Sequence, residues 1–501
     1  MSEPRVTTEG AEVLVATPNG QVRGLWREPR GCGKSAAFLG IPFAQPPTGA
    51  LKFEAPVPVE PWDGVRDATE YGPTPQRHPA AEITLIPEPS VSGDSTLNVN
   101  VFTPRPGDTA ALLPVMVYIH GGGYVSGSPA SPWYDGAAFN RDGVVTVTVS
   151  YRLGFEGFGH IDGCPENRGA RDWLAALEWV RRTIAVFGGD PGNVTIAGQS
   201  AGGGAVLTLL GMPAARGLFH RAWALSPGVA EVTRERAEAV ADRIAKLAGV
   251  PATKEGFASV DPDELVELEN QATNLLADTN VMAGIRGLLA EGLSLGPVVD
   301  GELIPQPILA AYGDGVGADI PLVIGSTQDE MTMIADSMPW SVRLVPPSAL
   351  LRALGVDRPT RRSYLRANAH QRRRDSPAVL GRYLGDAMLR VNIPRVAAAR
   401  EGAHTWAYVF AWPSASRGWA LHCLDVPFWF DCLADKHVPN IAGDAPPQSV
   451  ADDIHGAAVA FVASGDPGWP TWSSTPGMTR IFDTAGEPLR TDGYAELAAL
   501  V

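Results

Sequence analysis

The fold of this chain is predicted from one stretch of sequence, Val194-Thr195-Ile196-Ala197-Gly198-Gln199-Ser200-Ala201-Gly202. Residues 194–197 are apolar or β-branched and predict a short buried strand, and the small apolar residues 201–210 predict the start of a helix. Between them, the pattern Gly-x-Ser-x-Gly places Ser200 on a turn whose two glycines let strand and helix approach closely. The stretch therefore predicts a nucleophilic serine at the tip of a strand-turn-helix junction.

Two further apolar runs precede this junction and predict interior strands. Residues 114–119 are continuously apolar and end at a glycine cluster, and residues 144–149 are almost all β-branched. Between the second run and residues 194–197, apolar side chains recur at helical spacing over residues 173–184, and a glycine pair ends that pattern. Strand, helix and strand with short links form the unit of a parallel sheet. We therefore expect an α/β protein with a mostly parallel central sheet flanked by helices.

The middle of the chain predicts helices outside this sheet. Residues 233–249 have the pattern of an amphipathic helix that ends at a glycine able to take the left-handed cap conformation. Residues 336–400 are less regular, and no linker-like change of composition sets them apart. We expect residues 1–501 to form a single domain, with helical insertions over residues 230–300 and 336–420 that cap the active-site end of the sheet.

Composition and charge exclude several classes of protein. Of the 501 residues, 45% are hydrophobic, and the formal net charge of −15 argues against a nucleic-acid partner. Four cysteines without a Cys-x-x-Cys pair predict neither a disulfide scaffold nor a thiolate metal site. The first residues lack the pattern of a signal peptide, and no apolar run is long enough to cross a bilayer. We expect a cytoplasmic protein that does not bind membranes.

A glycine-rich loop follows the first predicted strand, where His120 precedes three consecutive glycines. Consecutive glycines allow backbone N–H groups to converge on one point, as an oxyanion requires. We predict that the N–H groups of Gly122, Gly123 and Ala201 form an oxyanion hole, and the alternative is a loop that is merely flexible. His120 itself is expected to have a structural hydrogen-bonding role.

Longer strings resemble one enzyme family over nearly the whole chain. Residues 40–44 (Gly-Ile-Pro-Phe-Ala), 150–154 (Ser-Tyr-Arg-Leu-Gly) and 187–191 (Phe-Gly-Gly-Asp-Pro) are similar to blocks of the type B carboxylesterases. This group contains the bacterial para-nitrobenzyl esterases and is related to the cholinesterases. The resemblance implies an α/β-hydrolase fold and ester hydrolysis through an acyl-serine, with neither metal nor cofactor.

A serine hydroxyl needs a base, and in α/β hydrolases the base comes last along the chain. The late histidines are His370, His404, His422, His437 and His455. The residues alone modestly favour His422, because the apolar run that follows it could anchor a rigid loop. The resemblance selects His422, since the family's catalytic histidine precedes an acidic residue, here Asp425, and a Pro-Phe pair.

The acid that orients this histidine is assigned from the resemblance. The family places a glutamate shortly after a strand that ends in Ile-Gly, and residues 324–325 followed by Glu330 fit that arrangement. Asp329 stays the alternative. The family usually has glycine after the glutamate, but this chain has Met331, which places an apolar side chain near the site. Ser226 matches a family serine that hydrogen-bonds near the triad.

The predicted reaction is hydrolysis of a small carboxylic ester with an aromatic or short-to-medium acyl group. Tyr124, Met331, Phe428 and Trp429 adjoin the catalytic motifs in sequence, and some of them are predicted to line an apolar substrate pocket, with plain core positions as the alternative. An amidase or carbamate hydrolase would use the same triad, and a cholinesterase-like binding module without activity is a further alternative. The sequence does not determine the oligomeric state, and a monomer is the default expectation.

Overall fold

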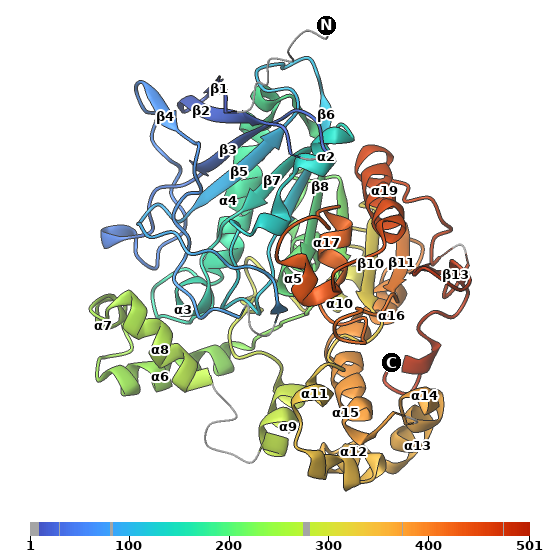
Figure 1. The fold of residues 1–501 in the computed structure, drawn as a ribbon. Coiled ribbons are helices and arrows are strands. Elements are labelled where there is room, and N and C mark those ends of the chain that lie inside the picture. The colour runs from blue at the N-terminus through green and yellow to red at the C-terminus, as the bar shows by residue number, and fades with distance from the viewer. Residues whose placement is uncertain (1–9, 30, 81–83, 274–280, 373, 474) are drawn as a thin grey trace, which may run out of the picture.

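One large sheet runs through the computed structural model, which describes residues 10–29, 31–80, 84–273, 281–372, 374–473 and 475–501 (Figure 1). In spatial order its strands are β1 (Glu12–Thr17), β2 (Gly20–Arg27), β3 (Ser35–Pro42), β5 (Asn98–Thr103), β7 (Val145–Val149), β6 (Leu113–Ile119), β8 (Gly189–Gln199), β9 (Arg221–Leu225), β10 (Leu322–Thr327), β11 (Thr405–Phe410), β12 (Thr479–Phe482) and β13 (Leu489–Arg490), and β4 (Val65–Asp67) pairs with β2. From β7 through β12 all neighbours are parallel. Antiparallel pairs join β1 to β2, β2 to β3, β3 to β5, β5 to β7 and β12 to β13, whereas β4 is parallel to β2. The expectation of a mostly parallel central sheet is confirmed.

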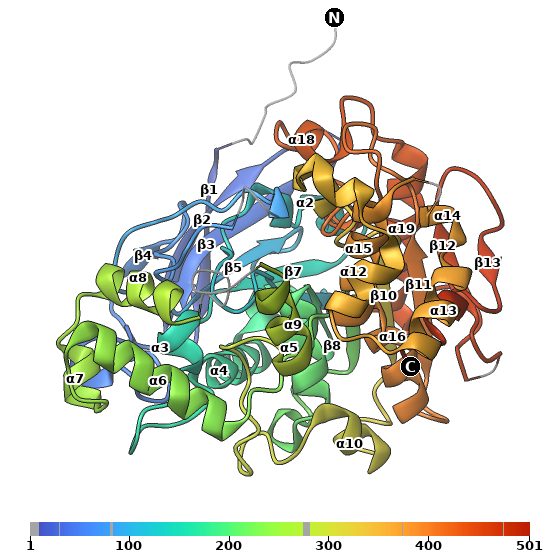
Figure 2. The ribbon, with the colours of Figure 1, turned by 90° about the horizontal axis from the view of Figure 1, so that it is seen from below.

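Helices flank the sheet and also gather at one of its ends (Figures 1 and 2). Those close to the strands are α2 (Ala137–Arg141), α3 (Gly154–Phe158), α4 (Arg168–Thr183), α5 (Ala201–Leu210), α10 (Ile308–Gly313), α16 (Asn392–Ala399), α17 (Asp425–Trp429), α18 (Val438–Ala442) and α19 (Gln448–Ser464). The others are α6 (Arg234–Ala248), α7 (Lys254–Ala258), α8 (Pro262–Thr273), α9 (Val281–Glu291), α11 (Ile334–Ser337), α12 (Pro347–Ala353), α13 (Arg358–Ala367), α14 (Ala369–Arg372) and α15 (Ser376–Gly385). Within the described ranges, no helix combines the length and the apolar character needed to span a membrane.

Side chains of β6 explain why the central strands are continuous apolar runs. Successive side chains of a strand point to opposite faces of the sheet. Val115 and Val117 pack into the core that contains α4 and α5, whereas Met116 and Tyr118 pack into the core that contains α17 and α19. Because helices cover both faces, both sets of side chains are apolar and buried.

The predicted elements around the serine are present with small changes of boundary. The runs 114–119 and 144–149 form β6 and β7, the run 194–197 lies within the longer β8, and the helical pattern forms most of α4. One arrangement differs from the simplest expectation. β6 lies between β7 and β8, so α4 connects two strands that are separated by a third.

The predicted insertions hold most of the peripheral helices, with one correction. The segment 230–300 carries α6 to α9, and its residues 274–280 lie outside the described part of the chain. The segment 336–420 is not helical throughout, because its residues 405–410 form β11 between β10 and β12. The six side chains of β11 are all buried, so this stretch is an interior strand of the sheet and not part of a cap.

Candidate active site

Ser200 stands at the junction that the sequence predicts, between the end of β8 and the start of α5. Its backbone has φ +58° and ψ −120°, a conformation that costs a non-glycine residue about 1–3 kcal/mol. A side chain at Gly202 would collide with the backbone of Ile119 on β6, and one at Gly198 would collide with Gly202. The two glycines are therefore required by close packing, and they leave the half-buried serine on a strained turn.

His422 and Glu330 form a short, buried contact beside this turn. Nδ1 of His422 lies 2.5 Å from Oε2 of Glu330, and the other carboxylate oxygen accepts the N–H of Thr327 at 2.9 Å. Glu330 is fully buried and His422 is 8% exposed. Burial disfavours the Glu330 anion, but His422 and the hydrogen bonds outweigh it and lower the pKa of Glu330 below its ordinary value.

The backbone holds these two residues together independently of their side chains. The N–H of His422 donates to the carbonyl of Glu330 at 2.9 Å, and the N–H of Asp329 donates to the carbonyl of Ala420, also at 2.9 Å. The loop after β10 thus pairs with the loop before α17. Burial disfavours the charged form of His422, but Cys423 and Glu330 more than compensate, so the pKa of His422 is raised above its ordinary 6.5.

Asp329, the alternative acid, points elsewhere. Its carboxylate accepts hydrogen bonds from Gln371 at 2.9 Å and from Arg382 at 3.3 Å. Gln371 and Arg382 belong to α14 and α15, and the second carboxylate oxygen of Asp329 accepts the backbone N–H of Ala420 at 3.4 Å, not the ring of His422. Among the described residues, the carboxylate that meets His422 at hydrogen-bond distance is that of Glu330.

Ser226 follows β9 and lies behind the carboxylate of Glu330. Its hydroxyl helps to lower the pKa of Glu330 and accepts the N–H of Thr327 at 3.4 Å. The N–H of Ser226 donates to the carbonyl of Gly325 on β10 at 2.7 Å, which fixes its position. Ser226, which the family resemblance places near the predicted triad, therefore lies beside Glu330.

The glycine loop has the left-handed backbone that only glycine adopts readily, with φ +114° at Gly122 and +63° at Gly123. The N–H and the hydroxyl of Ser126 donate to the carbonyl of Gly122 at 2.9 and 2.8 Å and hold the loop. Gly123 and Ala201 line the same cavity as Ser200. Of the three predicted donors, Gly123 and Ala201 thus lie at the cavity that Ser200 lines, and Gly122 belongs to the loop that these hydrogen bonds hold.

His120 has a structural place in this loop. It is buried, its Nδ1 lies 2.8 Å from the carbonyl of Gly121, and its ring stacks on Tyr151 with ring centroids 4.6 Å apart. Burial lowers the pKa of His120 to about 4, so the ring is neutral and donates to that carbonyl.

Two polar side chains near His422 receive no role from the sequence patterns. Nε2 of Gln199 lies 3.1 Å from Nε2 of His422, the nitrogen that faces away from Glu330. Asp425 is fully buried, accepts a hydrogen bond from the Tyr408 hydroxyl at 3.1 Å, and has its pKa raised to about 7 by burial and by Glu330. Gln199 occupies the variable position before the nucleophile, where a sequence pattern carries no signal, and only the fold brings it to the histidine.

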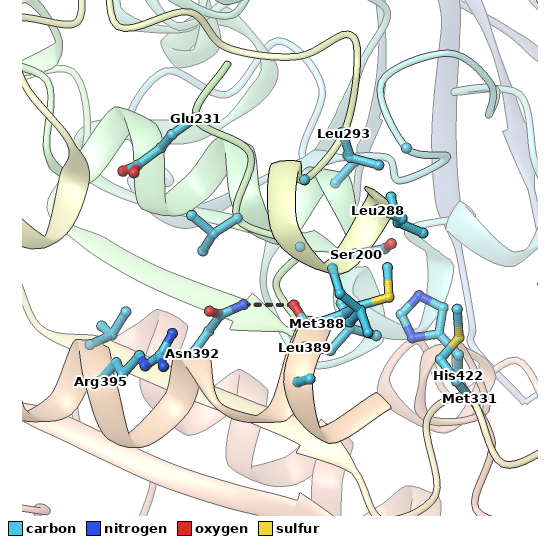
Figure 3. A pocket seen from close by; sticks show the side chains of 18 of the residues that line it. Ser200, Glu231, Leu288, Leu293, Met331, Met388, Leu389, Asn392, Arg395 and His422 are labelled. Atoms are coloured by element: carbon cyan, nitrogen blue, oxygen red, sulfur yellow. Dashed lines mark hydrogen bonds between the residues drawn. The ribbon is translucent and has the colours of Figure 1, made fainter. Parts of the chain in front are cut away.

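A cavity of about 340 Å³ opens above Ser200 and His422 (Figure 3). Its walls come mainly from α9, the π-helical turn Asp386–Arg390, α16 and the segments that follow β9 and β10, and they are mostly aliphatic with three further polar side chains, Glu231, Asn392 and Arg395. Apart from Ser200 and His422, its larger side chains are Val229, Glu231, Leu288, Leu289, Leu293, Leu309, Met331, Met388, Leu389, Asn392, Arg395 and Val396. Met331 is one of the residues that line this cavity.

Three of the predicted pocket residues lie in the core instead. Phe428 packs against Phe410 with ring centroids 5.1 Å apart, and Trp429 packs against Phe139 at 5.0 Å. Tyr124 is buried behind the cavity wall, with its hydroxyl 3.4 Å from the carbonyl of Gly228. The pocket prediction is wrong for these three, because Phe428 and Trp429 turn toward strands of the sheet, and Tyr124 packs against Phe158 of α3 and Trp173 of α4.

The polar groups of the cavity lie apart from Ser200 and His422 in Figure 3. Asn392 donates to the carbonyls of Pro227 and Met388 at 3.0 and 3.1 Å, and Glu231 accepts the N–H of Ile308 at 2.6 Å. Burial raises the pKa of the Glu231 carboxyl. Among the described residues, no cluster of His, Cys, Asp and Glu side chains could hold a metal ion.

Comparison with known proteins adds an independent line of evidence. The model of the carboxylesterase family matches residues 11–487. The chain is 32% identical to the para-nitrobenzyl esterase of Bacillus subtilis (strain 168), over 97% of this chain and 96% of that protein. It is also 32% identical to a liver carboxylesterase of Sus scrofa, over 93% and 89%. Among solved structures, a carboxylesterase of Geobacillus stearothermophilus superposes with a TM-score of 0.80 at 29% identity, over 97% of this chain and 100% of that one.

Proposed function

The chain belongs to the carboxylesterase family and is a serine hydrolase of carboxylic esters, and on that premise we propose that Ser200, His422 and Glu330 are its catalytic triad. The observation that carries the proposal is the 2.5 Å contact between Nδ1 of His422 and Glu330, beside a cavity that Ser200 and His422 both line. With Nδ1 committed to the carboxylate, Nε2 is the nitrogen left to receive a proton.

The first half of the reaction forms an acyl-enzyme. Oγ of Ser200 attacks the ester carbonyl carbon while its proton moves to Nε2 of His422, and Glu330 stabilises the imidazolium. The carbonyl oxygen becomes an oxyanion next to the N–H groups of Gly122, Gly123 and Ala201. His422 then gives the proton to the departing alkoxide, the carbon–oxygen bond breaks, and the alcohol leaves.

The second half returns the enzyme to its starting state. A water molecule attacks the acyl-serine carbonyl and gives its proton to Nε2 of His422. The bond to Ser200 breaks, the proton returns to Oγ, and the carboxylic acid leaves. Each step uses the same base and the same oxyanion hole.

The cavity favours aliphatic over aromatic substrates. Its described wall contains leucine, valine and methionine side chains but no phenylalanine, tyrosine or tryptophan, and methionine adapts its shape easily. A volume of about 340 Å³ suits a short-to-medium acyl chain. Amide or carbamate hydrolysis by the same triad stays the alternative, and matched ester and amide substrates with one acyl group separate the two.

We also propose a single domain over residues 1–501 in the cytoplasm. One sheet that takes strands from Glu12 to Arg490 supports the single domain, and the peripheral helices α6 to α9 and α11 to α15 serve as its cap. The unbridged thiols of Cys164, Cys423 and Cys432 support a reducing compartment. Fractionation of the source cells tests the location.

A fluorophosphonate probe followed by peptide mapping tests the nucleophile. The probe is expected to label Ser200 in the wild-type protein and to leave Ser200→Ala unlabelled. Ester hydrolysis by Ser200→Ala should fall on the order of 10⁶-fold in kcat if the triad acts as a unit. A loss of only a few-fold, or a label on another residue, contradicts the proposal.

A further inference from the structure

The side chain of Gln199 reaches the nitrogen that must accept the proton of Ser200. Gln199 ends β8 one residue before the serine, and its Nε2 lies 3.1 Å from Nε2 of His422. Gln199 is 1% exposed and His422 is 8% exposed, so little water competes for the contact. Two nitrogens at this distance form a hydrogen bond only if one donates and the other accepts.

The partner of the other ring nitrogen decides which atom donates. Glu330 as a carboxylate only accepts, so Nδ1 of His422 carries a hydrogen toward it. In the neutral ring, Nε2 therefore has a free lone pair and accepts the N–H of the Gln199 amide. In the charged ring, Nε2 also carries a hydrogen, and two N–H groups would face each other. The amide in this orientation thus favours the neutral base.

The other end of the same amide lacks a partner. Oε1 of Gln199 is buried and makes no hydrogen bond within the described part of the chain. It is an acceptor, the kind of group that a charged His422 needs at Nε2. A side chain at Gly121 would lie 3.0 Å from this oxygen and 3.1 Å from Cβ of Ser200, so the glycine keeps the space around the amide open.

We propose that Gln199 is a positioning residue, whose amide holds Nε2 of His422 as a hydrogen-bond acceptor in the resting enzyme and, after a half-turn, accepts from Nε2–H when the ring is charged. The proposal rests on the function proposed for Ser200 and His422. Gln199 neither gains nor loses a proton. The hydroxyl proton of Ser200 moves to Nε2 and then to the leaving alcohol, while the amide changes only the atom that faces the ring.

Several other groups act on His422 and must be kept constant in any test. Glu330 approaches from the loop after β10, with Ser226 behind it, and Cys423 and Asp425 belong to the histidine's own loop and α17. None of these residues changes when Gln199 is replaced. A difference between Gln199 variants therefore reports the contribution of the amide itself.

Two substitutions of Gln199 test its hydrogen bonding to His422. If the role of Gln199 were purely structural, neither would shift the protonation of His422. Gln199→Met keeps the length of the side chain but removes its N–H, so the neutral ring loses a hydrogen bond and protonation becomes easier. Gln199→Glu places an acceptor, and usually a negative charge, against Nε2 and favours the charged ring more strongly. The matched control is Gln21→Glu, which adds the same charge at an exposed position of β2.

Nuclear magnetic resonance of the full chain labelled with ¹⁵N-histidine reads the protonation of His422 directly, with His422→Asn for assignment. Gln199→Met is expected to move the titration midpoint to higher pH by up to about one pH unit, the size of one hydrogen bond. Gln199→Glu is expected to move it by about one to three pH units in the same direction. Midpoints of both variants that agree with wild type, in proteins with wild-type circular dichroism, overturn the proposal.

Ester hydrolysis gives the second readout and separates this inference from the proposed function. The lower-pH limb of kcat/KM should move with the titration midpoint in both variants and stay unchanged in Gln21→Glu. An equal loss of rate at every pH, with unmoved midpoints, assigns Gln199 to packing alone and overturns the proposal. If Ser200→Ala hydrolyses esters at the wild-type rate, the proposed function is contradicted. The resonance titration of His422 still decides the role of Gln199 in that case.

Discussion

Arg390 donates to Oδ1 of Asp386 at 2.6 Å, and these two residues bracket the π-helical turn whose middle residues line the cavity. Both side chains are fully buried, and Arg390 also contacts Glu496 near the C-terminus at 2.6 Å. Arg382 contacts the same two carboxylates, at 3.1 Å for Asp386 and 2.9 Å for Glu496. One buried ionic network therefore ties the cavity wall to the end of the chain. π-Helical turns occur frequently at functional sites, and here the turn carries Met388 into the cavity.

Arg390→Met is expected to destabilise the protein by about 3–5 kcal/mol, because it removes one of the two buried cations and leaves Asp386 and Glu496 with Arg382 alone. Urea unfolding measures the loss. The KM for long-chain esters should rise more than kcat falls, since the turn shapes the cavity and not the triad. Arg358→Met, at an exposed position on α13, is the control and should change the free energy of unfolding by less than about 0.5 kcal/mol.

Glu330→Gln is expected to lower kcat by about 10⁴-fold, because the amide no longer fixes the tautomer of His422 or balances its charge. The neighbouring carboxylate gives a matched comparison. Asp329→Asn removes a negative charge at the residue before Glu330. The side chain of Asp329 contacts Arg382 and Gln371, so this substitution should lower kcat by less than about tenfold. Steady-state kinetics with one ester decides, and equal losses in the two variants would contradict the assignment of the acid.

The raised pKa of His422 predicts where activity is lost in acid. The base works only when it is neutral, so kcat/KM should fall as the pH drops through a midpoint above the ordinary 6.5. Glu330→Gln removes a charge that favours the protonated ring and should move this midpoint to lower pH. A pH–rate profile of residual activity tests the shift. A midpoint that moves to higher pH in Glu330→Gln would show that a group other than His422 controls the loss of kcat/KM in acid.

Glu269 predicts a separate dependence of stability on pH. It lies on α8, is 4% exposed, and accepts the N–H of Phe155 at 2.7 Å, which joins α8 to α3. Burial raises its pKa from 4.5 to about 7. Because the pKa of Glu269 is higher in the folded than in the unfolded state, its protonation stabilises the folded state. This contribution is fully present below pH 4.5 and is lost as the pH rises through about 7.

Glu269→Gln should therefore flatten the dependence of the free energy of unfolding on pH between about 4.5 and 7 by up to about 3 kcal/mol. Denaturant unfolding at several pH values measures the slope. Glu267→Gln, two residues away and exposed, is the control and should leave the slope of wild type unchanged. A variant at Glu269 with the wild-type slope would rule out this carboxyl as the source.

Met388→Trp is expected to shorten the preferred acyl chain, because Met388 lies beside Ser200, His422 and Met331 in the cavity (Figure 3). Rates over a series of p-nitrophenyl esters from acetate to decanoate measure the change. The longest esters should lose more than about tenfold relative to acetate, as expected for chains that no longer fit the cavity. Leu247→Trp, at an exposed site on α6, should keep the wild-type profile, and a uniform loss over the series would argue against a chain-length role.

Much of the active site could be predicted from local sequence, and particular residues show why. Ser200 and its flanking glycines satisfy a constraint that is local to the turn: a positive φ at the serine and backbone contacts too close for side chains. The glycine loop has the same local character, with left-handed backbone at Gly122 and Gly123. His422 and Glu330 needed the resemblance to a family, because the bond between them joins residues 92 positions apart in the chain.

The peripheral parts were harder to predict. Residues 405–410 follow a long helical stretch. No pattern in the adjacent sequence predicts that they form β11, an interior strand of the sheet. The aromatic residues after His422 are apolar whether they face a cavity or a core. Tertiary packing alone directs Phe428 toward Phe410 on β11 and so away from the substrate.

The sequence by itself determined the parallel sheet, the serine on its sharp turn and the glycine loop, because periodicity and backbone sterics act over a few residues. Tertiary structure alone decided which side chains form the cavity, that Met388 enters it on a π-helical turn, and that Gln199 meets Nε2 of His422. These features depend on which distant segments cover each face of the sheet. That choice is made by long-range packing and buried hydrogen bonds, which no local pattern encodes.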